Sequence, residues 1–174
     1  DTSDTVTADK TGDLEIGGSF AGKLPEGFDA EKLLSMFEVG GPGEPSTTEQ
    51  ENPHGITWTF NSGDEAFNFL PAGETIILTY TVEATDSHGG KTTHPVTITI
   101  TGTNDVPVAA PDAETISKND PSVGGNVLVN DHDPDQGDEI KVVGVTKGKE
   151  DTAGGNVGAG VPGEYGTIII NEDG

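Results

Sequence analysis

Four aspartates, at positions 131, 133, 135 and 138, stand close together in the segment LVNDHDPDQGDE, which contains no basic residue. Carboxylates at such spacing repel one another unless a counter-charge neutralises them. The alternation of Asp131, Asp133 and Asp135 allows one tight loop to turn several oxygens toward a single point. Ca²⁺ accepts about six to eight oxygen ligands, so these three residues are predicted Ca²⁺ ligands. A solvated acidic loop is the main alternative, and a site for another metal is the third.

The acidic segment does not follow the pattern of an EF-hand. Counted from Asp131, its sixth position is Gln136 and its twelfth is Val142, where that motif requires glycine and glutamate. One loop also offers too few oxygens to close a site. We therefore expect further ligands from elsewhere in the chain.

Nothing in the sequence indicates catalysis, and the chain is predicted not to be an enzyme. Its histidines are scattered and give no converging zinc ligands. It has neither a nucleophile–base pair nor a phosphate-binding loop, and NSGDE at 61–65 is expected to be a turn rather than a catalytic acid pair. The Asp133–Pro134 bond is acid-labile, and self-cleavage there is a minor alternative to a ligand role.

The charge balance narrows the range of partners. The 174 residues include 31 acidic and 8 basic ones, which gives a formal net charge of -23. Nucleic acid and anionic membrane surfaces are disfavoured, since both attract clustered lysine and arginine, whereas hard cations suit this composition. Cysteine is absent, which excludes disulfides, and no apolar run is long enough to insert into a membrane. The sequence begins at Asp1, and we expect it to be a piece of a longer protein.

Alternating β-branched residues predict β-strands in the first part of the chain. The predicted strands span 56–60, 75–84 and 95–102, and the Gly-Gly loop at 86–91 is expected to join the last two as an antiparallel hairpin. We expect Trp58 to lie in the core rather than on a sugar-binding surface.

One helix is predicted, in segment 28–37, with Asp29 as its N-cap. Leu33, Leu34 and Phe37 would share its apolar face. The segment that follows, 40–55, is rich in glycine and proline and is expected to be a surface loop.

The second part of the chain begins after an extended, proline-containing connector at 106–114. Further strands are predicted at 125–129, 140–145 and 166–171. Because only 30% of the residues are hydrophobic, we expect two thin domains, 1–105 and 106–174, rather than one large core.

Two weak internal similarities relate these parts. Segment 55–65 aligns with 166–174, and 1–8 aligns loosely with 133–143. If both alignments hold, the first domain lacks its first two strands and the second lacks its last two, so that the sequence is out of phase with a tandem array. The alternative is chance similarity between two β-rich halves.

Three motifs, AGET, YTVEATDSHGG and TITGTND, lie within the segment 67–109. This segment resembles the C-terminal half of a VCBS-type repeat, a cadherin-like repeat of giant bacterial RTX or biofilm-associated adhesins. Segment 4–39 is similar to the middle of such a repeat, and 125–174 to the start of the next one. The resemblance implies an all-β fold of immunoglobulin-like antiparallel β-sandwiches in tandem. It also implies type I secretion and an extracellular location on the bacterial cell surface.

The resemblance to cadherins further implies a Ca²⁺ site at the junction of two repeats, built from a glutamate, an Asn-Asp linker and an Asp-x-Asp loop. The residues that match this pattern are Glu74, Asn104, Asp105, Asp131, Asp133 and Asp135. Val106 and Pro107 follow the linker where the cadherin pattern has a second asparagine, which leaves the number of ions open. Asp86 would be a ligand at the opposite end of the first domain, joined by Asp1 or Asp4.

Each of these assignments has a plainer alternative. Asn104 and Asp105 are also suited to capping a turn, and a lone surface carboxylate such as Glu74 or Asp86 is commonly just solvated. Asp112 and Asp138 are expected to be solvated rather than to bind a cation.

The predicted function is that of a Ca²⁺-stiffened extender in a surface adhesin. Its partners would be the neighbouring repeats of the same chain, with contact to a host or biofilm surface made through other domains. The alternative is a module that binds a glycan or a peptide, or a split repeat that flanks such a module. An exposed aromatic platform or an open Ca²⁺ at a loop tip would favour the alternative.

Overall fold

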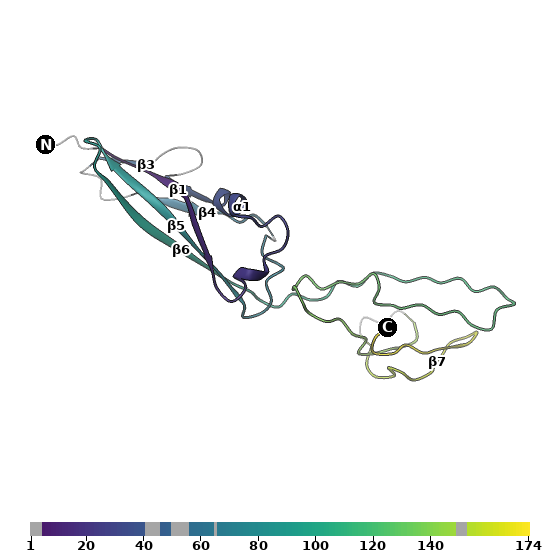
Figure 1. Ribbon diagram of the computed structural model, residues 1–174. Coiled ribbons are helices and arrows are strands. Elements are labelled where there is room, and N and C mark those ends of the chain that lie inside the picture. The colour runs from purple at the N-terminus through teal and green to yellow at the C-terminus, as the bar shows by residue number, and fades with distance from the viewer. Residues whose placement is uncertain (1–4, 41–45, 50–55, 65, 149–152) are drawn as a thin grey trace. The chain divides into compact units, whose positions relative to one another are not determined.

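The computed structural model describes residues 5–40, 46–49, 56–64, 66–148 and 153–174 (Figure 1). The chain divides into two compact units, Asp1–Asn104 and Asp105–Gly174. The described strands pair antiparallel and the one α-helix within the described ranges is short, so the fold class is all-β. No helix in the described ranges has the length and apolar character needed to cross a bilayer.

The first unit is built on a four-stranded antiparallel sheet with the order β3-β1-β5-β6. Its strands are β1 (Thr5–Gly17), β3 (Ser46–Glu49), β5 (Thr75–Asp86) and β6 (Lys91–Thr101). A second, two-stranded sheet pairs β2 (Phe37–Val39) with β4 (Trp58–Phe60). Figure 1 shows β1, β5 and β6 running side by side, with α1 beside the sheet.

The hairpin of β5 and β6 confirms the strands and the turn that the alternating sequence predicted. Every second side chain of β5 is buried, from Ile76 to Ala84. The register pairs Ile76 with Ile100 and Leu78 with Ile98, which brings apolar side chains of both strands to one face. Pairs of this kind stabilise an antiparallel ladder, and the face forms the floor of the core.

The helix α1 spans Ala30–Ser35, and the Asp29 side chain accepts a hydrogen bond from the Lys32 N–H at 2.9 Å. This confirms the predicted N-cap. A short 3-10 helix, η1 (Ala21–Lys23), precedes it. Leu33 of α1 is fully buried, and its carbonyl accepts a hydrogen bond from the Tyr80 hydroxyl at 2.9 Å.

The long strand β1 was not predicted. A register shift between Lys10 and Leu14 interrupts its alternation, because a β-bulge puts extra residues on one strand. Lys10 is also a charged residue in a partly buried position, where its ammonium donates to the carbonyls of Leu34 and Phe37 at 2.8 and 2.6 Å. The amine thereby joins the last turn of α1, through Leu34, to β2, through Phe37.

Two expectations for the first unit are wrong. The segment 40–55 is not only a loop, since it contains β3, which pairs with β1; its other residues, apart from Gly40, lie outside the described ranges. Trp58 is not a core residue, because 46% of it is exposed. Its ring centre lies 5.7 Å from that of Phe37, and the remainder of the side chain is accessible to solvent.

The second unit contains much less regular structure. Its strands are β7 (Val161–Pro162) and β8 (Thr167–Ile168), which pair with each other. The predicted strands at 125–129 and 140–145 do not form, and the third predicted strand is reduced to β8. Their backbones make single hydrogen bonds instead, such as Val142 N–H to the Glu172 carbonyl at 2.9 Å. The reason is the small core: among the described residues, the buried hydrophobic side chains of this unit are Val145 and Val161, so an alternating segment finds no apolar face to cover.

Candidate cation site

The acidic loop of the second unit is fastened to the segment that begins at Asp105. The Asp105 N–H donates to Oδ2 of Asp135 at 2.8 Å. The Ala110 N–H donates to Oδ1 of Asp131 at 2.8 Å. Between these two contacts, Val108 and His132 exchange a reciprocal pair of backbone hydrogen bonds. The loop is thus held in place by residues about twenty to thirty positions earlier in the chain.

Asp135 stands out among the charged residues of the described chain because it is buried, with only 2% of its surface exposed. One of its oxygens, Oδ2, accepts the hydrogen bond from Asp105. The other, Oδ1, is inaccessible to solvent and has no hydrogen-bond partner. Burying a carboxylate without a partner is costly, and an orphaned acceptor of this kind calls for a neutralising group that touches it.

Asp133 and Asp138 provide the companions of Asp135. One carboxylate oxygen from each of these three residues lies within 4.8 Å of the other two. Two ligands on opposite sides of one Ca²⁺ are about 4.6–5.2 Å apart, twice the usual Ca–O distance, so three oxygens at this spacing can share one ion. Asp133 is half-buried and Asp138 is exposed, which leaves one side of the group open to water ligands.

The loop backbone explains how Asp138 joins the other two. The Asp135 N–H donates to Oδ1 of Asp133 at 2.9 Å, and the Asp138 N–H donates to the Asp135 carbonyl at 3.2 Å. Gly137 between them has a φ of 100°, a conformation that glycine adopts without a steric penalty. The turn therefore folds the chain back and returns Asp138 to the side where Asp133 and Asp135 lie.

Sequence reasoning placed Asp138 among the solvated carboxylates and did not include it in the site. The sequence did contain a pattern that could have indicated Asp138: Asp133, Asp135 and Asp138 form a D-x-D-x-x-D pattern with a glycine before the last aspartate. Asp131 is not part of the group of three, and its Oδ1 instead accepts from Ala110. It positions the segment opposite the loop, and its ligation stays a prediction.

Two further predicted ligands, Glu74 and Asn104, belong to the first unit. Glu74 lies in the turn before β5, where its N–H donates to the Pro71 carbonyl at 3.0 Å and its carbonyl accepts from Gly102 at 2.9 Å. Asn104 is the last residue of the unit. Asp105 contacts the loop through its backbone N–H. Ligation of a cation by the side chains of Glu74, Asn104 and Asp105 stays a prediction.

Asp86 ends β5 and holds the hairpin turn together. Its Oδ1 accepts hydrogen bonds from the N–H groups of Gly90, at 2.7 Å, and His88, at 2.9 Å. These bonds lower the pKa of Asp86 below its ordinary value, and the bond from Gly90 has the largest effect. They do so because they favour the charged form of the carboxyl group. The carboxylate therefore has a structural role in this turn, and its predicted role as a cation ligand stays a prediction.

Comparison with known proteins found no matching family model, no matching curated protein and no matching solved structure. The geometry of the acidic loop is therefore the basis on which a function is argued.

Proposed function

We propose that this chain is a non-enzymatic, Ca²⁺-binding structural segment of a bacterial surface adhesin. The observation that carries the proposal is the buried Asp135 carboxylate, which has an orphaned Oδ1 and contributes one of its two oxygens to a group with Asp133 and Asp138. Three carboxylates with oxygens within 4.8 Å of one another favour a hard cation with oxygen ligands, and Ca²⁺ is the one that accepts irregular, partly hydrated sites most readily.

Cation binding would do more than neutralise the loop. Asp135 uses its second oxygen to hold the N–H of Asp105, and Asp105 directly follows the last residue of the first unit. A cation that fixes the Asp135 carboxylate would also fix the start of the second unit. Because the metal ligands come together only in the folded loop, binding free energy would contribute to the order of this segment. The proposed role is therefore to stiffen an array of tandem repeats at the start of each repeat.

The proposal includes a finer fold assignment, an immunoglobulin-like sandwich for the first unit. Two sheets contribute to one core there: Phe37 of β2 stacks on Tyr80 of β5 at 4.3 Å, and Phe60 of β4 lies 6.4 Å from the same ring. Aromatic contacts between the faces of two sheets are what a sandwich requires. The adhesin context, with secretion and surface location, is supported by the family resemblance of the sequence motifs.

Calorimetric titration with Ca²⁺ tests the proposal, with Mg²⁺ as the competing ion. We expect one or more Ca²⁺ to bind with a Kd between about 1 µM and 1 mM. The variant Asp138→Asn, which alters an exposed residue, is expected to weaken binding about tenfold or more. The matched control is Asp120→Asn, an exposed aspartate of the same unit outside the group of three, and it should leave the Kd unchanged.

The structural role requires a second measurement on the same protein. Small-angle scattering of the whole chain, with Ca²⁺ and with a chelator, reports whether the ion narrows the distribution of shapes. If Ca²⁺ does not bind below about 10 mM, the cation site itself is refuted. Binding without any change in scattering or in melting temperature would leave a cation site but refute the extender role.

A further inference from the structure

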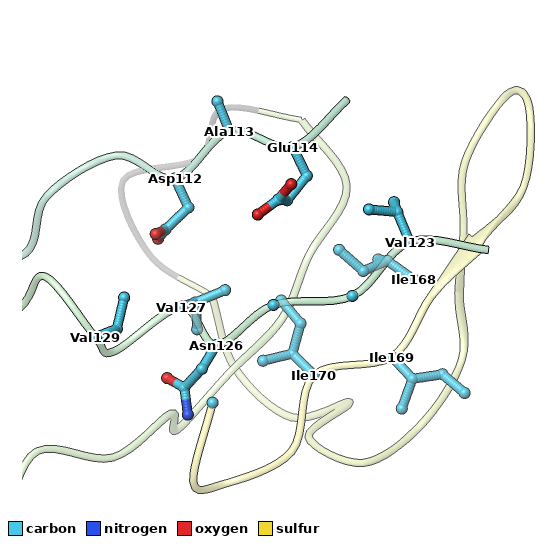
Figure 2. A pocket seen from close by; sticks show the side chains of 13 residues that line it. Asp112, Ala113, Glu114, Val123, Asn126, Val127, Val129, Ile168, Ile169 and Ile170 are labelled. Atoms are coloured by element: carbon cyan, nitrogen blue, oxygen red, sulfur yellow. The ribbon is translucent and has the colours of Figure 1, made fainter. Parts of the chain in front are cut away.

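The second unit contains a groove that has no part in the cation site. Its volume is about 440 Å³, within the usual range for ligand sites of about 300–1,000 Å³. Figure 2 shows the carboxylates of Asp112 and Glu114 on one segment of its wall and aliphatic side chains across from them. The aliphatic residues that the argument uses are Val123, Val127, Ile168 and Ile170.

The apolar wall of the groove is one part of a larger exposed hydrophobic surface on this unit. With the exception of Trp58, the exposed large hydrophobic side chains of the described residues all belong to the second unit. Ile168 is 54% exposed and Val129, at the end of the groove, is 81% exposed. Contiguous exposed aliphatic surface of this kind marks a place where another apolar surface binds.

The backbone next to the groove favours an extended partner. β8 pairs with β7 along one edge, and across the described part of the chain no strand pairs with its other edge. An unpaired edge presents N–H and C=O groups that an added strand can bind. Ile168 and Ile170 stand two residues apart in the sequence. In an extended strand, side chains two residues apart point to the same side and are separated by about 6.6–6.8 Å.

The charge of the groove indicates which extended partner fits. Within the described ranges the ion pairs join Lys91 to Glu83 and Lys141 to Glu172, so neither Asp112 nor Glu114 is neutralised by one. A second copy of this chain would bring another charge of -23 to the same place, which opposes self-association. A glycan is disfavoured because no aromatic side chain lines the groove.

We propose that this groove binds an extended peptide segment in which aliphatic side chains alternate with polar ones and a lysine or arginine lies at one end. The aliphatic side chains lie against Val123, Val127, Ile168 and Ile170. The basic side chain lies between the carboxylates of Asp112 and Glu114. The peptide backbone extends the β7–β8 sheet at the free edge of β8. This inference is independent of the cation site and holds with or without Ca²⁺.

Fluorescence anisotropy with a labelled peptide tests the inference on the whole chain. The probe is a peptide of about eight residues in which valine alternates with threonine after an initial lysine. We expect a Kd between about 10 µM and 1 mM, as for a small interface. Replacing the lysine of the probe with glutamine should weaken binding about two- to fivefold, as for a solvent-exposed ion pair. The double variant Asp112→Asn/Glu114→Gln should remove that difference between the two probes.

Variants of exposed residues distinguish binding in the groove from non-specific hydrophobic binding elsewhere on the unit. Ile168→Glu is expected to weaken binding at least tenfold, and Val129→Glu serves as a second groove variant if Ile168→Glu alters the circular dichroism spectrum. The matched control is Val143→Glu, since Val143 is 76% exposed in the same unit but does not line the groove. It should bind the probe as the parent chain does.

Four results would overturn the inference. The first is absence of binding up to about 1 mM probe. The second is equal weakening by Ile168→Glu and Val143→Glu, which would show a non-specific apolar surface. The third is self-association in sedimentation equilibrium that Ile168→Glu abolishes, which would make a second copy the occupant. The fourth is binding to a glycan array, but not to the peptide, that Ile168→Glu removes.

Discussion

Replacing Asp135 with asparagine is expected to stabilise the second unit when Ca²⁺ is absent and to remove most of the stability that Ca²⁺ adds. Asparagine keeps an oxygen that accepts from the Asp105 N–H, which Asp135 now holds at 2.8 Å. Its amide N–H₂ can face the oxygens of Asp133 and Asp138. The substitution therefore removes a buried charge without removing the contact that fastens the loop.

The size of the first effect follows from the spacing of the carboxylates. The carboxylate oxygens lie within 4.8 Å of one another, and two unit charges at that limit repel by about 1 kcal/mol in water and by about 3.5 kcal/mol at an effective dielectric constant of about 20. Leaving the buried Oδ1 unpaired costs a similar amount, about 1–3 kcal/mol. Without Ca²⁺, the asparagine variant should be more stable by about 1–3 kcal/mol.

The second effect follows from mass action. At a Ca²⁺ concentration about one hundred times Kd, binding stabilises the parent chain by about 2.7 kcal/mol. A variant whose affinity is about a hundredfold lower gains only about 0.4 kcal/mol at the same concentration. The Ca²⁺-dependent increment should therefore fall by about 2 kcal/mol.

Amide hydrogen exchange measured by NMR is the appropriate assay, because the only tryptophan, Trp58, lies in the first unit. The amides of Asp105 and Ala110, which donate to Asp135 and Asp131, report on the opening of the site directly. Asp120→Asn is the control. If the variant keeps the full Ca²⁺ increment, Asp135 is not a ligand. If it is less stable than the parent without Ca²⁺, the buried carboxylate is not strained by its neighbours.

Three further predictions concern the first unit. Lys10→Met should destabilise it by about 1–3 kcal/mol in urea denaturation, because the carbonyls of Leu34 and Phe37 each lose the hydrogen bond from the Lys10 ammonium; an equally stable variant would contradict this role. Burial raises the pKa of Tyr80 to about 12, so folding stability should be full below about pH 10 and fall by roughly 2–3 kcal/mol as the pH rises toward 12. In the variant Tyr80→Phe, folding stability should no longer fall by this amount between about pH 10 and 12. If the stability of the variant falls with pH as the parent's does, the role assigned to Tyr80 is refuted. The lowered pKa of Asp86 means that the hairpin is stable above the usual carboxyl range and loosens as the pH falls through the folded pKa. Carboxyl NMR should show that pKa below the usual range, and Asp86→Asn should remove the loss of protection, relative to the intrinsic exchange rate, that the turn amides otherwise show at acid pH.

Local patterns in the sequence predicted much of the first unit. The alternation within β5 and β6, the short turn between them and the N-cap of α1 each depend on residues within a few positions of one another, so period and composition were enough. The strand β1 was missed because its bulge breaks the alternation, and Lys10 stands where an apolar residue would be expected. Trp58 was misplaced because residue type alone does not decide burial: the same short strand, β4, contains the exposed Trp58 and the partly buried Phe60.

For the acidic loop, the sequence by itself determined the spacing of the carboxylates and the absence of a basic residue among them, and from these a cation site is predicted. Only the tertiary structure decided which carboxylates meet. Asp135 is buried because the segment from Asp105 to Ala110 lies against the loop, and Asp138 joins it through the turn at Gly137. In the second unit the alternating segments did not become strands, since strand formation needs an apolar surface to cover, and that surface is supplied by the rest of the fold.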